Sequence, residues 1–252
     1  MSKRIKTITG GRLVAGVCYT VGTIRDGAEE RTAKSRMSAE AQEHINLRRA
    51  WQKLEMLLAA NYGPRDLHIV FTYDDDHLPS SRDEANKRLR KMLPQLRKHR
   101  KARDQPTKYI YVTEQLSSEG GRLHHHMVLN GTGNDIEVLR SLWPYGQVEL
   151  ERLDVWQGYE ALAKYLTKEP REAGRAEAGA RSWTPSVGLN KPEAETETAS
   201  DHVTLSAPPG AIILARRENH NEYGDYLYIK YLMPEKREEK KGTRPPRRRT
   251  RK

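Results

Sequence analysis

A chain of 252 residues with a mass of 29.0 kDa can form one large domain or one domain with appendages, and its 45 Lys and Arg against 34 Asp and Glu give a net charge of +11. The single Cys18 excludes an internal disulfide framework and a cysteine-based zinc site, and the sequence has neither an apolar run near the ~18 residues of a membrane span nor the apolar segment of a secretory signal. These properties favour a cytoplasmic protein with a polyanionic partner.

Hydrophobic periodicity and turn residues predict a series of helices and strands. They are expected at residues 38–60 (helix), 66–73 (strand), 82–102 (helix), 108–114 (strand), 122–130 (strand), 135–143 (helix), 147–153 (strand), 156–168 (helix), 211–217 (strand) and 225–232 (strand). Ser81 and Glu84 form a capping box for the second helix, which Pro94 should kink or split, and Asp154 is a candidate cap of the fourth. This order predicts an α+β fold with a mainly antiparallel sheet.

Three segments carry little periodic pattern. Residues 235–252 hold ten Lys and Arg against three Glu, so we expect a disordered basic tail. Residues 169–206 are rich in Ala, Gly, Glu, Pro and Thr and are expected to be mostly loop, and residues 1–37 are ambiguous. The predicted organisation is an N-terminal extension (1–37), a central domain (38–170), a loop-rich region with C-terminal strands packing on that domain (171–234), and the tail (235–252).

The most informative segment is the predicted strand 123–129, LHHHMVL. Side chains alternate between the two faces of a strand, so His124 and His126 project the same way, ~6–7 Å apart along the strand. Pairing with the preceding strand can bring Glu114 beside both histidines. Two imidazoles and one carboxylate suit Mg²⁺ or Mn²⁺, with waters and a phosphate completing the shell.

Other interpretations of the histidine run stay open. It could be a metal-binding accident of the surface, or the polar side of an otherwise apolar strand. Glu119 is a rival for the acid position, but it lies in the hairpin loop and is expected to face solvent. His125 points to the opposite face, where core packing or solvent exposure is the default.

A second signal is the predicted helical segment 164–169, KYLTKE. Tyr165 and Lys168 are three positions apart and therefore share a helix face. A phenol becomes a nucleophile when its phenolate is stabilised, which an ammonium group and a divalent ion can both do. Attack on a phosphodiester would release a 3′-hydroxyl and leave a 5′-phosphotyrosine. The alternative is a half-buried packing tyrosine, and Tyr159, on a different face, is expected to pack or to contact DNA.

Three segments in this order resemble the motifs of the HUH endonucleases that initiate rolling-circle replication: LHIVFTYDD (67–75), YVTEQLSSEGGRLHHHMVL (111–129) and AKYLTKE (163–169). The similarity covers about residues 65–170. It is greatest to the replication initiators of small single-stranded-DNA phages and prophages, of the filamentous-phage and microvirus kind. The resemblance implies an endonuclease domain with a central antiparallel sheet of about five strands, the histidine strand in mid-sheet and the tyrosine helix over it.

The resemblance also implies roles for five residues. These are the metal-binding pair His124 and His126, the third ligand Glu114, the nucleophile Tyr165 and its helical companion Lys168. One departure is His125, because the middle residue of this histidine motif is usually hydrophobic. Another is Ala161, at the position where some relatives carry a second active tyrosine. A single-tyrosine enzyme is therefore implied, and how the second strand transfer ends a replication round stays open.

DNA binding is expected to come from basic residues around the second helix. The predicted phosphate contacts are Lys87, Arg88, Arg90, Lys91, Arg97, Lys98 and Lys164, and Arg100, Lys101 and Arg103 belong to the same basic region. A solvated helix face is an equal alternative. The tail is expected to add sequence-independent affinity. Asp74, Asp75 and Asp76 can approach the metal, but a solvated acidic turn is favoured.

The leading hypothesis is a replication initiator that acts as a metal-dependent, site-specific single-strand DNA endonuclease (nickase) and strand transferase. Its expected partners are single-stranded origin DNA, a host or phage helicase and a polymerase, because the sequence has no phosphate-binding P-loop motif. The expected location is a bacterial cytoplasm, with no membrane partner. Alternatives are an HUH transposase or mobilisation relaxase, a metal-activated-water hydrolase, and a non-catalytic single-stranded nucleic-acid-binding module built on Tyr109 and Tyr111.

Overall fold

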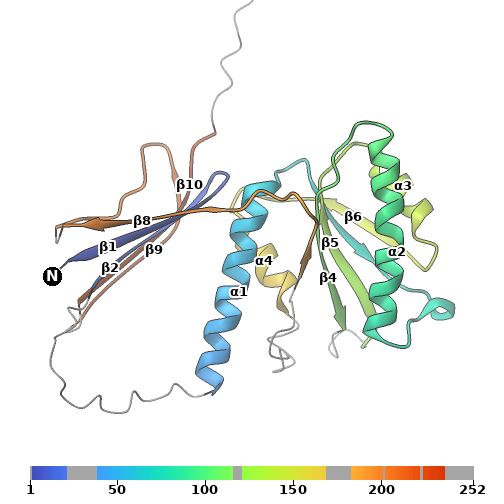
Figure 1. The fold of residues 1–252 in the computed structure, drawn as a ribbon, viewed down its shortest axis with the longest axis horizontal. Helices are drawn as coiled ribbons and strands as arrows, with labels where there is room; N and C mark the ends of the chain where they lie inside the picture. Colours follow the sequence, from blue (N-terminus) through green and yellow to red (C-terminus); the bar gives the residue numbers. More distant parts are fainter. Residues whose placement is uncertain are drawn as a thin grey trace, which may run out of the picture.

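The computed structural model describes residues 2–21, 39–115, 121–168, 183–200, 202–221 and 224–235. Two antiparallel five-stranded sheets lie on either side of one long helix (Figure 1). This arrangement confirms the predicted α+β class. Within the described ranges, none of the helices combines the length and the apolarity needed to cross a membrane.

The histidine strand lies in the first of the two sheets, here called sheet B. Its strands are β3 (Leu67–Phe71), β4 (Tyr109–Gln115), β5 (Leu123–Leu129), β6 (Val148–Arg152) and β7 (Thr184–Pro185). They lie in the order β6-β3-β5-β4-β7, so the histidine strand β5 is in the middle of a five-stranded sheet, as the resemblance implied. Its neighbours β3 and β4 both run antiparallel to it.

The helices of the described residues match the predicted ones in number and order. They are α1 (Ala39–Asn61), α2 (Arg82–Lys101), α3 (Asp135–Leu142) and α4 (Glu160–Leu166), with a short 3-10 helix η1 (Asp75–His77). The predicted capping box is half formed: the Ser81 hydroxyl accepts from the Glu84 amide at 3.2 Å, but the Glu84 carboxylate accepts from Ser80 instead. Pro94 lies inside α2 without splitting it. Because Pro94 is exposed, water can bond the carbonyl that its missing N–H leaves free.

Helix α4 begins later than predicted. Its first residue is Glu160, and Asp154 does not cap it, because the Asp154 carboxylate accepts from the Trp156 amide at 3.2 Å. Gly158, at φ +82°, accounts for the delay, since this left-handed backbone conformation is incompatible with a right-handed helix.

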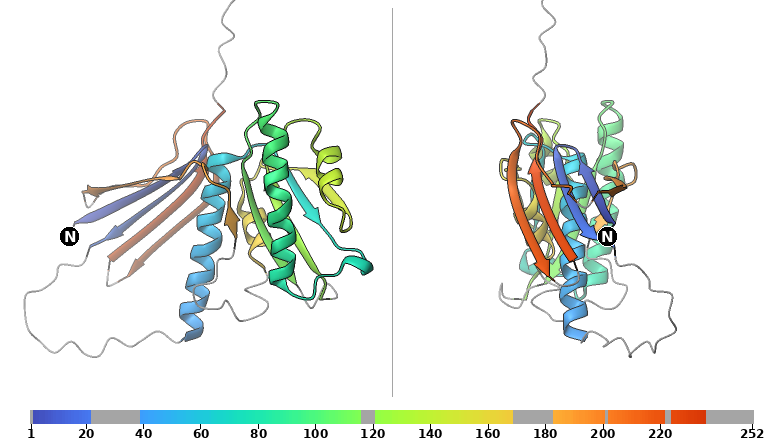
Figure 2. Two further views of the ribbon diagram at one scale, coloured as in Figure 1. Left: turned by 45° about the vertical axis from the view of Figure 1, so that its right-hand side comes forward. Right: turned by 90° about the vertical axis from the view of Figure 1, so that its left-hand side faces the viewer.

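Alternation along the strands gives sheet B two different faces. One face packs against α2 and α3, with Ile69, Phe71 and Met127 fully buried. The opposite face shares a core with α1 and α4, with Ile110 and Val128 fully buried. The ribbon views show α2 and α3 on one side of the sheet and α1 and α4 on the other (Figures 1 and 2). The histidine pair lies on the α4 side.

The second sheet, sheet A, joins strands from opposite ends of the described chain. Its strands are β1 (Lys3–Gly10), β2 (Leu13–Thr20), β8 (Glu193–Ala199), β9 (Ile212–Asn221) and β10 (Gly224–Leu232), in the order β8-β1-β2-β10-β9. The two late strands were predicted. Strands β1 and β2 were not, because residues 1–37 gave no clear pattern, and β7 and β8 lie in the segment 169–206 that was expected to be mostly loop.

Helix α1 connects the sheets through close backbone contact and charge. A Cβ atom on Gly10 would lie 2.4 Å from the Met56 carbonyl oxygen, so only glycine allows the β1–β2 turn to pack this closely on α1. On the same side of sheet A, the Lys230 ammonium of β10 bonds the carboxylates of Glu55 on α1, at 2.8 Å, and of Glu160 on α4. Sheet A, α1 and the tyrosine helix are therefore joined directly.

Several predictions lie outside the described residues. They concern the loop residue Glu119 and all but the first residue of the basic tail 235–252. The predicted domain boundaries also stay a prediction. The late strands do more than pack on a central domain, however, because β10 pairs along its length with β2.

Candidate metal centre

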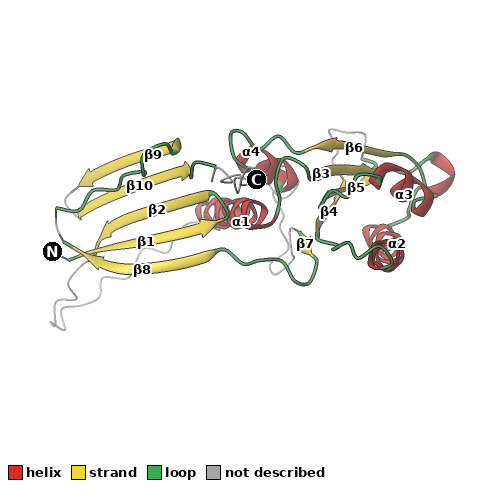
Figure 3. Ribbon diagram, turned by 90° about the horizontal axis from the view of Figure 1, so that it is seen from above, coloured by secondary structure: helices red, strands yellow, loops and turns green. Residues whose placement is uncertain are grey.

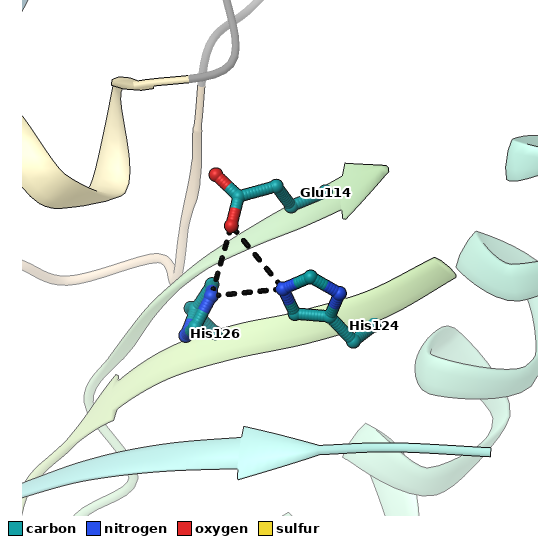
Figure 4. A group of neighbouring side chains, drawn as sticks. All are labelled: Glu114, His124 and His126. Carbon is teal, nitrogen blue, oxygen red and sulfur yellow. Dashed lines mark hydrogen bonds and ion pairs between the residues drawn. The ribbon is translucent and has the colours of Figure 1, made fainter. Parts of the chain in front are cut away.

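Three side chains of ligand type meet on the α4 side of sheet B (Figure 4). The β4–β5 register places Glu114 directly opposite His124 and Val112 opposite His126. The Glu114 Oε2 atom lies 3.2 Å from His124 Nε2 and 3.0 Å from His126 Nε2, and the two nitrogens are 3.2 Å apart. The structure thus brings together the trio that the sequence predicted, in a group that could bind a metal ion.

The trio has the spacing and chemistry of a divalent cation site. Ligands at right angles around an octahedral ion with ~2.1 Å bonds are roughly 3.0 Å apart, close to the three distances observed here. The Glu114 side chain is fully buried, and its second oxygen, Oε1, has no hydrogen-bond partner among the described residues. A buried carboxylate oxygen is costly without a partner, so its free lone pairs favour a cation or an ordered water.

Electrostatics keep the trio in the protonation state that metal binding needs. Burial alone would raise the pKa of Glu114, but hydrogen bonds from His124 and His126 and the charge of Lys168 outweigh it and lower that pKa to about 2. Burial also lowers the pKa of His126, against the effect of its hydrogen bond to Glu114. An ionised carboxylate and a neutral imidazole are the forms that bind metals.

Tyr165 and Lys168 lie beside this trio. The Lys168 ammonium is 3.3 Å from Glu114 Oε2 and 4.2 Å from the centre of the Tyr165 ring. The Tyr165 ring is in edge contact with the His126 ring, at 5.0 Å between centroids, and it remains 40% exposed. The phenol is therefore accessible to a large substrate while its ring touches a candidate metal ligand.

His68 is a functional candidate that the sequence reasoning missed. Its Nε2 lies 3.2 Å from His126 Nδ1, its Nδ1 lies 2.9 Å from Glu151 Oε1, and its ring stacks on that of His126. If Glu151 accepts from His68 and His68 accepts from His126, then Nε2 of His126 keeps a free lone pair directed at the metal position. Such outer partners fix the orientation and tautomer of a metal-binding histidine.

The pattern of the sequence contained part of this signal. His68 alternates with Ile69 and Phe71, so period-2 reasoning places it on the face opposite to those core residues. What the sequence could not supply was the β3–β5 register, in which His126 pairs with Val70 and His68 is diagonal to it.

Replacing His68 with alanine is expected to weaken Mn²⁺ binding about 10- to 100-fold, because His126 loses the partner that orients its ring. Electron paramagnetic resonance titration of free Mn²⁺ measures this affinity. The exposed His77, which bonds only Asp74 and the backbone of its own turn and of α2, gives the matched control, His77→Ala, with unchanged affinity. Equal affinities for the His68→Ala variant and the unaltered protein would remove His68 from the centre.

The neighbouring candidates behave as structural residues. His125 is fully buried on the α2 side between the Tyr73 hydroxyl (2.7 Å) and the Thr113 hydroxyl (2.8 Å), and burial lowers its pKa to about 3. This is the core role expected of it. Tyr159 packs in the core and donates its hydroxyl to the Tyr62 carbonyl, while burial raises its pKa to about 12.

The acidic residues that follow β3 form an exposed turn. Asp74 caps η1 by accepting from the His77 amide at 2.9 Å, and Asp75 pairs with Arg122 at 2.7 Å. None of the acidic side chains of this turn belongs to the metal-ligand group found in the described residues. The favoured alternative, a solvated acidic turn, fits these contacts.

The predicted DNA-contacting residues fall into three groups. Lys87, Arg90, Lys91 and Lys98 are exposed on α2, which covers the face of sheet B opposite to the metal centre. Arg88, Arg97 and Lys164 have intramolecular partners: Glu84, the Tyr109 hydroxyl and Glu160 respectively. Arg100, which the sequence grouped with them, is 1% exposed and pairs with Asp135 at 2.7 Å, so it is a core residue rather than a phosphate contact.

Tyr109 and Tyr111 do not form the base-stacking surface considered from the sequence. Both rings are buried in the core between sheet B and α2, with 4% and 5% of their surface exposed. The interpretation of the chain as a passive binder therefore loses the residues on which it depended.

Comparison with known proteins gives one match. Residues 66–170 match the family model of the replication-associated protein ORF2. No curated protein and no solved structure gives a match. The matched range runs from the start of β3 to just beyond α4, so the part of the chain similar to replication-associated proteins is the part that carries the metal-ligand trio, Tyr165 and Lys168.

Proposed function

We propose that the protein initiates rolling-circle DNA replication as a metal-dependent nickase and strand transferase, acting on single-stranded DNA through Tyr165. The observation that carries this proposal is the contact of one accessible phenol ring with both a candidate metal ligand, His126, and an ammonium group, Lys168. The family match over residues 66–170 supports a role in replication.

The chain's own groups account for the chemistry as follows. The Tyr165 oxygen attacks the scissile phosphate, so that a phosphorus–Oη bond forms and the bond from phosphorus to the 3′ oxygen breaks. The phenol proton is lost and the departing 3′ oxygen gains one, which leaves a 3′-hydroxyl and a 5′-phosphotyrosine without consuming water. Lys168 offsets the negative charge that develops near the phenol oxygen. The new ester retains the energy of the broken one, so a 3′-hydroxyl can later reverse it.

Glu114, His124 and His126 would hold Mg²⁺ or Mn²⁺, which when bound polarises the scissile phosphate. The ligand set of two nitrogens and one carboxylate oxygen suits these ions with water and phosphate oxygens in the remaining positions. His68 would position His126, and burial of Glu114 would keep its charge effective.

The test is covalent capture. The full chain is incubated with end-labelled single-stranded DNA spanning a candidate origin in Mn²⁺, and the product is run on a denaturing gel. A labelled band at the mass of protein plus DNA is expected, and a chelator should abolish it. Multiple turnover of free DNA ends without such a band would instead indicate a metal-activated-water hydrolase.

A further inference from the structure

Sheet A presents aromatic and basic side chains in register on one face. Directly paired residues of antiparallel strands point to the same side, and the pairs Arg4–Tyr19 and Tyr19–Tyr226 make one cross-strand row. The next row on that side runs through Lys6, Val17, Tyr228 and Arg217. We call the group Arg4, Lys6, Tyr19, Arg217, Tyr226 and Tyr228 the tyrosine face.

Much of the tyrosine face is open to solvent. Tyr19 and Tyr226 are 36% and 44% exposed, and Arg4, Lys6 and Arg217 are exposed as well. Helix α1 packs on the same side of the sheet, but near one end of the strands, and Figure 3 shows the strands of sheet A extending well beyond it. Exposed tyrosines arranged in rows are unusual on a surface with no partner.

Charge is segregated between the two sides of sheet A. The tyrosine face carries three cations and no acidic residue, and none of the three has an ion pair within the described part of the chain. The opposite side carries Glu193, Glu195 and Glu197 of the edge strand β8, and its cations Lys3 and Arg216 pair with Asp225 and Glu218. Only one side of the sheet is therefore suited to a polyanion.

The tyrosine face leads toward the candidate metal centre. Along β10 the residues after Tyr226 on the same side are Tyr228 and then Lys230. Lys230 bonds Glu160, the first residue of α4, and α4 carries Tyr165. A strand lying along β10 would reach the helix of the proposed nucleophile without crossing the sheet.

We propose that the tyrosine face binds a single strand of DNA, with bases stacked on Tyr19 and Tyr226 and phosphates held by Arg4, Lys6 and Arg217. Single-stranded DNA combines exposed aromatic bases with a charged backbone, which matches a surface of tyrosines set among unpaired cations. The choice of DNA rests on the proposed function, whereas the surface lies outside the segment similar to replication-associated proteins.

The aromatic test measures binding of a fluorescent oligothymidine to the full chain by anisotropy, in chelator, so that neither cleavage nor adduct formation contributes. Tyr19→Leu and Tyr226→Leu are each expected to weaken binding about tenfold, because each removes a stacking platform. Tyr19→Phe and Tyr226→Phe keep the ring and should bind within about twofold of the unaltered protein. Thermal melting verifies that each variant is folded.

The charge test uses a neighbouring pair of arginines on opposite sides of β9. Arg217→Gln should weaken binding, whereas Arg216→Gln should not, since Arg216 points to the acidic side and pairs with Glu218. The combined variant Arg4→Gln, Lys6→Gln, Arg217→Gln should make the slope of log affinity against log salt about 2 units shallower, since each phosphate that is no longer neutralised accounts for ~0.7.

Three results would overturn the proposal: Leu variants that bind as tightly as the Phe variants, equal effects of Arg216→Gln and Arg217→Gln, or duplex DNA of the same length binding as tightly through the same residues. The outcome is separable from the proposed function. A protein that forms no adduct but loses oligothymidine binding through these variants keeps the surface and loses the nickase. One that forms the adduct and binds normally in every variant does the reverse.

Discussion

Replacing Tyr165 with phenylalanine is expected to abolish the covalent protein–DNA adduct, a loss of more than about 10³-fold, because the variant lacks the only atom that attacks the phosphate. The ring of Phe keeps the edge contact with His126 and the contact with Lys168, so the fold and DNA affinity should be unchanged. Adduct formation is measured on a denaturing gel, and affinity by anisotropy with the same oligonucleotide in chelator.

The matched control lies one residue before the same helix. Tyr159→Phe removes a hydroxyl that donates to the Tyr62 carbonyl in the core, far less exposed than that of Tyr165. This variant should be somewhat less stable but should still form the adduct. An adduct that persists in Tyr165→Phe and disappears in Tyr159→Phe would move the nucleophile to Tyr159 and refute the assignment.

Replacing Arg100 with methionine is expected to lower the free energy of unfolding by about 3–5 kcal/mol, because a buried charge pair then loses one partner. Arg100 bonds Asp135 at 2.7 Å and both the side chain and the carbonyl of Asn130 at 2.8 Å. Burial alone would raise the pKa of Asp135, but hydrogen bonds from Thr132 and the charge of Arg100 lower it, so Asp135 would remain charged when Arg100 is removed.

Thermal unfolding measures this effect, which corresponds to a decrease in Tm of roughly 6–20 °C for a chain of this size. Lys98→Met, on the exposed side of the same helix, is the control and should leave Tm within about 2 °C. If Arg100→Met instead melted like the unaltered protein and bound DNA more weakly, Arg100 would belong to a DNA-binding surface, as its place among other cations in the sequence suggested.

The elements of sheet B and the metal centre were predictable because they depend on local information. Strand β4 and strand β5 are separated by a short connection, so the hairpin fixes their register and brings Glu114 opposite His124. The helices were equally visible in the period of their apolar residues. The starting point of α4 was not, since it depends on the conformation of Gly158 rather than on any hydrophobic pattern.

Sheet A could not be predicted for the opposite reason. Strand β8 (EAETETA) has no large apolar residue, and β1 alternates charged residues with Ile5 and Ile8 too irregularly to be distinctive. These strands are stable only because β2 pairs with β10 from the other end of the chain, and no local pattern encodes such a partner. The contact between His68 and His126 was missed for the same reason, since it depends on pairing between β3 and β5.

The pairing of β2 with β10 has a consequence for biosynthesis. The ribosome releases β1 and β2 among the first segments, yet β2 gains its second neighbour only when β10 emerges near the end of translation. Sheet B, whose strands β3 to β6 follow one another closely, can assemble in the interval. We therefore expect the nascent chain to contain a folded metal centre before it contains a complete sheet A, with the early hairpin waiting for its last strand.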